Sequence, residues 1–418
     1  MQIIADLHTH SRFSRACSND ITIRSMEATA LQKGISLLAT GDFVNAPWLS
    51  ELKLNLEESG AGLYRIKGSQ SNVRFMVGGE VSTIYEHSGK IRKVHHCVFV
   101  KSIEEAEQLR DILKKRGSLD SDGRPTLMMS SAELVDAAIS TDKNAFVFPA
   151  HAWTPYFGVL GSMSGFDSIE EAYEDRVDHI YALETGLSSD PQMNWRLSKL
   201  DRFALVSNSD MHSLPKMGRE ANVFDISDFT YDAIVDAIRK KDPKRFLHTI
   251  EYYPEEGKYH YDGHRQCSYS SDPETQKSDI CPVCGKKLVI GVLHRVNDLA
   301  DRPPGFVPKG AIPYKKTVPL IEIIAYVLRK SSYSAAVKSM YNDMISKLGN
   351  EFSILLDAST ESIEGASNKG IAEAISNIRN ERISIDAGYD GVFGKVDMLN
   401  RESHRAFENR QRSLFQQG

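Results

Sequence analysis

Eight residues spread over the first 212 positions are of the types that bind divalent metal ions. The set opens with His8 and His10 in Asp-Leu-His-Thr-His and closes with Asp210 and His212 in Ser-Asp-Met-His; between them stand Asp42, Glu80, His95 and His151. Imidazole nitrogens combined with carboxylate oxygens suit Zn, Mn or Mg. Ions held in this way lower the pKa of a bound water and stabilise charge on a phosphoryl group. The set therefore indicates metal-dependent hydrolysis of a phosphate ester.

Most of these residues lie at or near the carboxyl ends of predicted strands. Because side chains alternate along a strand, Asp6, His8 and His10 are expected to face the same way. Predicted helices separate the strands, which is the rhythm of an α/β domain. Strand ends of this kind converge on one mouth in a closed barrel, so we predict a barrel rather than an open sheet. The predicted strands are 2–7, 35–39, 73–77, 94–100, 145–151, 180–183, 204–207 and 246–250, and the predicted helices include one that Asn19 or Asp20 caps and Gly34 ends, 103–115, 130–139 and 229–239.

A second polar cluster, Glu184 to Arg196, follows a predicted strand and is expected at the same mouth. One interpretation is a polar loop in which Asp190 or Ser189 caps the following helix. The other is substrate contact, with Glu184 and Asp190 positioning the substrate. In that case Arg196 would bind phosphate, and Asn194 and Trp195 would contact a base.

Three of the five cysteines predict a structural zinc site. Cys267, Cys281 and Cys284 lie within 18 positions, and with His264 they form His-x-x-Cys followed by Cys-x-x-Cys. This spacing is typical of structural zinc. His260 is the competing fourth ligand. An odd cysteine count also argues against a disulfide framework. His294 and Arg295, in the segment that follows, could serve a polyanion.

Length and composition place the chain among multidomain globular proteins. The 418 residues are 41% hydrophobic and 26% charged, and the net charge of −5 neither favours nor excludes nucleic acid. No apolar run reaches the roughly 20 residues of a membrane span, and no signal peptide is evident. We therefore expect a cytoplasmic protein. The predicted domains are 1–250, 251–308 (the zinc module) and 309–418, which is mostly helical, with helices near 319–329, 333–348 and 370–382 and a tail containing Arg401, Arg405, Arg410 and Arg412.

The ordered motifs resemble those of the PHP (polymerase and histidinol phosphatase) superfamily, whose members fold as a distorted (β/α)7 barrel and bind two or three divalent metals. The resemblance implies a first metal on His8, His10, Glu80 and Asp210, and a second on Glu80, His95 and His151. It implies a third metal on Asp42 and His212, although Arg15 and Ala16 stand where many relatives place His or Asp. It also favours His95 over His96 as the ligand.

Over nearly the whole chain, the barrel, the zinc module with Ile290 to Pro303, and Gly388-Tyr-Asp-Gly-Val-Phe-Gly394 resemble the endonuclease Q family. The resemblance implies a nucleoid-associated DNA repair endonuclease that cleaves 5′ to deaminated bases (uracil, hypoxanthine, xanthine) or abasic sites. Its partners would be double- or single-stranded DNA carrying such lesions, and a sliding clamp is a candidate protein partner. The lesion would be flipped into a pocket.

Two alternatives stay open. A phosphatase of small phosphomonoesters would use the same metals, but it has no need of the zinc module or the C-terminal region. A non-catalytic DNA-binding scaffold with a degenerate barrel would not need a nearly complete ligand set.

Overall fold

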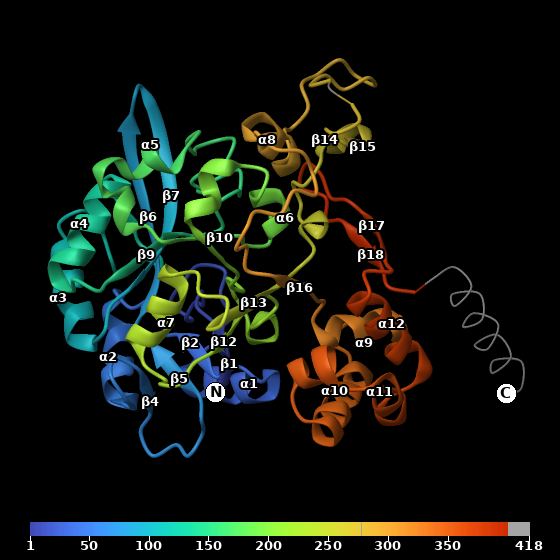
Figure 1. The fold of residues 1–418 in the computed structure, drawn as a ribbon, viewed down its shortest axis with the longest axis horizontal. Coiled ribbons are helices and arrows are strands. Elements are labelled where there is room, and N and C mark those ends of the chain that lie inside the picture. The colour runs from blue at the N-terminus through green and yellow to red at the C-terminus, as the bar shows by residue number, and fades with distance from the viewer. Residues whose placement is uncertain (277, 400–418) are drawn as a thin grey trace, which may run out of the picture.

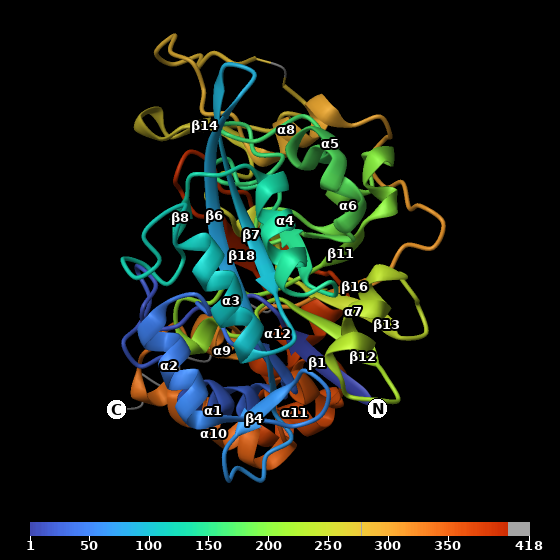
Figure 2. The ribbon, with the colours of Figure 1, turned by 90° about the vertical axis from the view of Figure 1, so that its left-hand side faces the viewer.

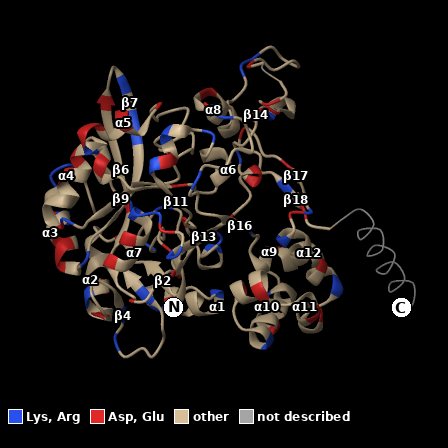
Figure 3. Ribbon diagram, viewed as in Figure 1, with Lys and Arg blue, Asp and Glu red and all other residues tan. Residues whose placement is uncertain are grey.

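The N-terminal part of the chain is mixed α/β, and a separate helical body follows it (Figures 1 and 2). The computed structural model describes residues 1–276 and 278–399, so the tail arginines from Arg401 onward lie outside the described residues. Within the described part, no helix is long and apolar enough to span a membrane. Acidic and basic residues are interspersed along the ribbon (Figure 3).

An eight-stranded sheet carries the first metal-binding motif. Its central strand β1 (Gln2–Asp6) pairs in parallel with β2 and antiparallel with β12. The sheet thus departs from the uniformly parallel pattern of an ideal barrel. The strand order is β16, β13, β12, β1, β2, β5, β4, β3. The bounds of the other strands, in chain order, are Leu37–Ala39 for β2, Leu56–Glu58 for β3, Tyr64–Ile66 for β4, Arg74–Met76 for β5, Ala221–Asp225 for β12, Phe246–Glu251 for β13 and Tyr314–Lys316 for β16.

A long antiparallel hairpin forms the second sheet and projects beyond the neighbouring helices (Figure 2). It consists of β6 (Gly78–His87) and β7 (Lys90–Phe99), flanked by β8 (Thr126–Leu127) and β9 (Phe146–Pro149). The chain enters β6 directly after β5, and β6 and β7 together place Glu80 and His95 within paired strands. Both residues therefore lie within paired strands, not at free strand ends as the sequence suggested, and the N–H of His95 donates to the carbonyl of Phe157 at 2.9 Å.

The two remaining strands of the α/β part, β10 (Ala182–Glu184) and β11 (Ala204–Val206), pair in parallel. An isolated parallel bridge joins Val147 of β9 to Ile180, which lies two residues before β10. Apolar side chains from both large sheets form the core, and Phe99, Phe146 and Phe148 contact one another there.

Helices cover the sheets much where the sequence predicted them. In α1 (Ile23–Lys33), the cap is Thr22 rather than Asn19 or Asp20: its hydroxyl accepts the N–H of Ser25, and the Ser25 hydroxyl accepts the N–H of Thr22. Gly34 ends this helix with φ of 86°, as predicted. The other main helices are α2 (Ala46–Asn55), α3 (Ile103–Leu113), α4 (Ser131–Thr141), α5 (Ile169–Tyr173), α6 (Pro191–Asn194) and α7 (Tyr231–Arg239).

The C-terminal helices form a body with its own apolar core (Figure 1, lower right). They are α9 (Leu320–Leu328), α10 (Ala335–Leu348), α11 (Thr360–Ala366) and α12 (Lys369–Arg379). This body docks on α1 through Lys33, whose ammonium lies 2.8 Å from the Glu351 carboxylate with both side chains buried. A second ion pair, Lys216 to Glu322 at 2.5 Å, ties it to the segment after Asp210 and His212.

The cysteine module, residues 258–276 and 278–291, lies beside α8 (Val292–Leu299) and away from the helical body (Figure 1). It contains β14 (Asp262–His264) and β15 (Tyr269–Ser271). The chain returns to it after the helices, through β17 (Ser384–Asp386), the glycine-rich turn and β18 (Lys395–Asp397). The N–H of Tyr261 donates to the carbonyl of Gly388 at 2.9 Å, so this late segment is part of the module's framework.

Candidate metal centre

Three turns at strand ends present site residues in left-handed backbone conformations. Asp42, His151 and Asp210 have φ of 41°, 30° and 46°. Non-glycine residues rarely adopt this conformation, and the strain it stores is typical of functional positions. Glycine permits the close approach that the turns need, since a Cβ on Gly79 would lie 2.6 Å from the backbone nitrogen of Asp42. The backbone is therefore shaped around these side chains.

Four donor groups converge in the first cluster, formed by His8, His10, Glu80 and Asp210. Oδ1 of Asp210 lies 3.0 Å from Nε2 of His10 and 3.6 Å from Nε2 of His8. Oε2 of Glu80 lies 3.5 Å and 3.7 Å from the same two nitrogens. Spacings of this size place four donor atoms around one point.

The second cluster shares Glu80 with the first. Oε1 of Glu80 lies 2.6 Å from Nδ1 of His95 and 3.0 Å from Nε2 of His151. One oxygen of Glu80 thus faces each cluster, which is the arrangement of a bridging carboxylate. The structure brings together the six residues expected at the first two metals; their roles as ligands stay a prediction.

The two adjacent histidines of β7 point in opposite directions. His95 faces the cluster, whereas His96 is bonded to Tyr173 and Thr83 at 2.8 Å and 3.0 Å in the core. Burial lowers the pKa of His96 to about 3, so it is a neutral core histidine. This geometry favours His95 as the donor.

Asp42 and His212 belong to neither cluster. The carboxylate of Asp42 accepts the hydroxyl of Ser11 at 2.5 Å and that of Ser14 at 2.8 Å, and it lies 3.2 Å from Nδ1 of His10. The His212 ring lies against that of His10 at a tilt of 55°, with ring centroids 4.7 Å apart. Asp42 therefore contacts Nδ1 of His10, on the side of the ring opposite the Nε2 that faces the first cluster. A third metal on Asp42 would have to displace the two serine hydroxyls.

The electrostatics of the clusters couple histidines to carboxylates. Burial by itself lowers the pKa of His10, but the carboxylates of Asp210 and Asp42 outweigh it and raise this pKa to about 9. Burial by itself raises the pKa of Glu80, but His95 and Arg124 outweigh it and hold this pKa well below its usual range. Burial lowers the pKa of His95 to about 4, which leaves it in the neutral form that binds metals.

One buried atom tests whether a metal ion fits. Nε2 of His8 is fully buried and has no hydrogen-bond partner among the described residues, although Nδ1 of the same ring lies 3.0 Å from Glu184. Buried polar atoms are nearly always satisfied. The unpaired nitrogen faces the oxygens of Glu80 and Asp210, so the donor set fits a divalent cation.

Asp6 lies outside the clusters, so the expectation that it would face the same site as His8 and His10 was wrong. Its carboxylate accepts the backbone N–H groups of Ser209 and Gly218, both at 3.0 Å. The chain twists away from regular strand after β1, so the alternation of faces does not continue through His10. Asp6 instead fastens the loop that carries Asp210.

Glu184 lies behind the metal-binding face. Its carboxylate contacts Nδ1 of His8, accepts the backbone N–H of His151 at 2.7 Å and accepts the amide of Asn208 at 2.8 Å. Cys97 lies close to this group, because β7 places it directly opposite Glu80 on the same face of the hairpin. Burial raises the pKa of the Cys97 thiol, so it stays protonated. Glu184 can orient two histidines at once, a role that the sequence did not reveal.

The residues expected to contact substrate, from Asp190 to Arg196, interact mainly with the protein itself. Asp190 caps α6 through the N–H of Met193 and pairs with Lys316 at 2.8 Å. Asn194 accepts the indole N–H of Trp153 at 2.8 Å. Arg196 donates to Asn297 at 2.5 Å. The capping interpretation of Asp190 is confirmed, and the substrate contacts of the other residues stay predictions.

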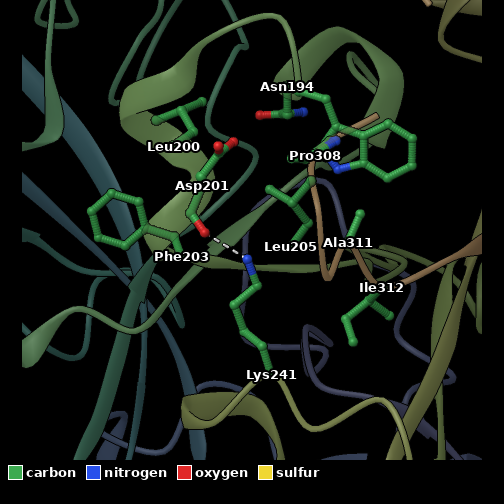
Figure 4. A pocket seen from close by; sticks show the side chains of 10 residues that line it. Asn194, Leu200, Asp201, Phe203, Leu205, Lys241, Pro308, Ala311 and Ile312 are labelled. Atoms are coloured by element: carbon green, nitrogen blue, oxygen red, sulfur yellow. Dashed lines mark hydrogen bonds between the residues drawn. The ribbon is translucent and has the colours of Figure 1, made fainter. Parts of the chain in front are cut away.

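Trp195 and Asn194 line a small pocket shared with the segment from Pro308 to Ile312 (Figure 4). The ammonium of Lys241 donates to the carbonyl of Asp201 at 2.6 Å across it. Its volume of about 20 Å³ has room for about one water molecule and none for a nucleobase.

The cysteine module assembles as the spacing predicted. His264, Cys267, Cys281 and Cys284 bring their donor atoms within 4.8 Å of one another. His260 is buried elsewhere, with its ring beside Tyr261, so the geometry favours His264 as the fourth donor. Three thiols and one imidazole are a donor set of structural zinc.

His294 ties α8 to β14, and Arg295 ties the same helix to the α/β part. Nδ1 of His294 lies 2.6 Å from Asp262 on β14. Arg295 donates to the carbonyls of Leu160 and Phe166 and pairs with Asp167 at 2.6 Å. Both side chains are engaged within the protein, and their contact with a polyanion stays a prediction.

Sequence reasoning missed Arg124, which reaches into the first cluster. Its Nη1 donates to Oε2 of Glu80 at 3.0 Å. It lies on an irregular segment between α3 and β8, where neither periodicity nor a metal-binding motif marks it. Only the tertiary structure places it at the site.

Comparisons with known proteins agree with this architecture. A family model described as the MJ0043 C-terminal domain matches residues 319–382, the greater part of the helical body. The MJ0043 protein of Methanocaldococcus jannaschii is 31% identical over 258 residues, which are 59% of this chain and 31% of that protein. The chain thus spans about a third of that relative's length. YqxK of Bacillus subtilis is 26% identical over 94% of this chain and 99% of its own.

Two solved structures match nearly the whole chain. One is the lesion-specific endonuclease PfuEndoQ from Pyrococcus furiosus, with a TM-score of 0.84 and 31% identity over 97% of this chain and 99% of that chain. The other is endonuclease Q in complex with a 27-mer duplex that has an abasic lesion at the active site, with a TM-score of 0.84 and 31% identity over 96% and 98%. With this identity over full-length coverage, the chain belongs to the endonuclease Q family.

Proposed function

We propose that this protein is a metal-dependent endodeoxyribonuclease of DNA repair, built on a distorted (β/α)7 PHP barrel. It hydrolyses the phosphodiester 5′ to a deaminated base (uracil, hypoxanthine or xanthine) or an abasic site. The observation that carries the proposal is the pair of buried clusters sharing Glu80, with an unpaired His8 nitrogen between carboxylates. The full-length similarity to an endonuclease crystallised on a lesion-containing duplex supports DNA as the substrate.

In this mechanism His8, His10, Glu80 and Asp210 would hold one divalent cation, and Glu80, His95 and His151 would hold another. Metal ions in such a set lower the pKa of water and stabilise charge on the reacting phosphate. Glu184 and Asp42 hold the rings of His8 and His10 in the required orientation. The damaged nucleotide leaves the base stack to reach the buried centre, as enzymes acting on single nucleotides require.

End-labelled duplexes test the proposal. The protein is incubated with manganese and with duplexes carrying uracil, hypoxanthine, an abasic site or no lesion, alongside a chromogenic phosphomonoester. We expect one nick 5′ to the lesion, abolished by chelator and by Asp210→Ala. Phosphate release without nicking would favour a phosphatase. Lesion binding without turnover would favour a scaffold.

A further inference from the structure

Arg124 brings a permanent positive charge to the shared carboxylate of the metal centre. Among the described residues, the ion pairs of Glu80 are made by imidazoles and by this one guanidinium. The Arg124 side chain is 25% exposed, whereas Glu80 is fully buried. The Arg124 side chain therefore lies between the buried carboxylate and solvent.

The backbone on both sides of Arg124 is fixed. The N–H of Gly123 donates to the carbonyl of Phe13, and the carbonyl of Pro125 accepts the N–H of Ser82, both at 2.9 Å. Asp122 accepts the N–H groups of Arg124 and Arg15 at 3.2 Å and 3.1 Å. A Cβ on Gly123 would lie 2.3 Å from Oδ2 of Asp42, so only glycine lets the segment pass this close. The segment is built to deliver Arg124 to the site.

The contact with Glu80 uses an oxygen that the first cation needs. Oε2 faces His8 and His10 and also accepts the hydrogen bond from Arg124. A guanidinium and a divalent cation repel each other, and an oxygen that binds one has less electron density for the other. Arg124 would then seek another anion within reach of its side chain. The phosphodiester of the substrate is the anion that arrives there, and guanidinium binds phosphate oxygens in a two-pronged geometry.

We propose that Arg124 is a catalytic residue that exchanges Glu80 for the scissile phosphate and stabilises the negative charge of the transition state. The inference rests on the proposed function for its substrate, and on the Glu80 contact for its geometry. No covalent step is assigned to Arg124. Its guanidinium binds the negatively charged phosphate and stays protonated throughout the reaction.

The test compares Arg124→Ala and Arg124→Lys with Arg116→Ala. Arg116 is a matched control on the same segment, because it pairs with exposed Glu133 away from the clusters. In single-turnover nicking of an abasic duplex, we expect Arg124→Ala to lower the rate by about 10²- to 10³-fold. Arg124→Lys should recover part of the loss, and Arg116→Ala should nick at the normal rate. Guanidinium ion at millimolar concentration should restore part of the rate to Arg124→Ala only.

A second readout separates catalysis from structure. Titration calorimetry with manganese should give Arg124→Ala the same stoichiometry as the unmodified protein and an affinity that is equal or tighter, because a competing cation is gone. Weaker manganese binding in parallel with the lost rate, without guanidinium rescue, would assign Arg124 a structural role and overturn the proposal. So would unchanged nicking by Arg124→Ala.

Failure of the proposed function gives a different result. If the unmodified protein nicks no lesion duplex, the endonuclease assignment fails. The same variants assayed on bis(p-nitrophenyl) phosphate then decide the role of Arg124, because that diester presents the same reacting group without DNA.

Discussion

Oε2 of Glu184 lies 3.0 Å from Nδ1 of His8 and also accepts the backbone N–H of His151 at 2.7 Å. One buried carboxylate on β10 therefore reaches both metal clusters, orienting the His8 ring directly and the His151 turn through its backbone. Partners of this kind fix the tautomer of a metal-binding histidine and raise its basicity.

Glu184→Gln should weaken binding of divalent metal by about 10- to 100-fold, since an amide is a poorer partner for a histidine N–H. Titration calorimetry with manganese measures this change. Glu251→Gln is the matched control, because Glu251 is another fully buried glutamate that contacts Thr185 and Thr249 and no histidine of the clusters. Equal affinities for the two variants would show that Glu184 does not orient the site.

The same Glu251 predicts how stability depends on pH. Burial raises the pKa of its carboxyl from the usual 4.5 to about 7. Between these values the folded protein keeps a proton that the unfolded chain has lost, so stability should decrease as pH rises from about 4.5 to about 7. Glu251→Gln should remove this contribution and raise the free energy of unfolding at pH 8 by about 3 kcal/mol. Urea denaturation at pH 5 and pH 8 measures the difference, with exposed Glu364→Gln as the control. A lower stability of Glu251→Gln at pH 8 would contradict it.

The buried ion pair between Lys33 and Glu351 should hold the helical body on the α/β part. Lys33→Met leaves the Glu351 carboxylate buried, with Tyr341 and the N–H of Leu320 as its remaining partners among the described residues, which should cost about 3 kcal/mol of unfolding free energy. Exposed Lys338→Met, on α10 and lining the same groove as Lys33, should cost less than about 0.5 kcal/mol. Chemical denaturation compares them, and adding Glu351→Gln to Lys33→Met should cost less than the sum of the single changes.

Removal of zinc should unfold the cysteine module and leave the rest of the fold standing. Cys281→Ser should abolish zinc binding by the His264, Cys267, Cys281 and Cys284 group and make the cysteine module sensitive to protease, because the module has little core of its own. Zinc content and limited proteolysis measure both effects. Cys17→Ser, outside the group, should retain the metal and the resistance. Retention of zinc by Cys281→Ser would show that the group is not its site.

The sequence by itself determined the residue types of the metal centre, the cysteine spacing and most helices. Local patterns can be recognised in the amino-acid sequence without knowledge of the fold. The patterns of this kind are His8-x-His10, Asp210-x-His212 and the Cys-x-x-Cys pair. Gly34 as the end of α1 was likewise predictable, because a left-handed cap is a requirement of a single residue.

Only the tertiary structure decided what depends on residues far apart in the chain. The hairpin register puts Cys97 opposite Glu80 and turns His95, not His96, toward the clusters. The twist after β1 sends Asp6 to the Asp210 loop instead of the metals. Arg124 arrives from an irregular segment 44 residues after Glu80, and no periodicity could place it. Residues far apart in the sequence come together according to how the sheets pack and the loops close. The packing that forms is the one that minimises the free energy of the whole chain, and no single segment determines it.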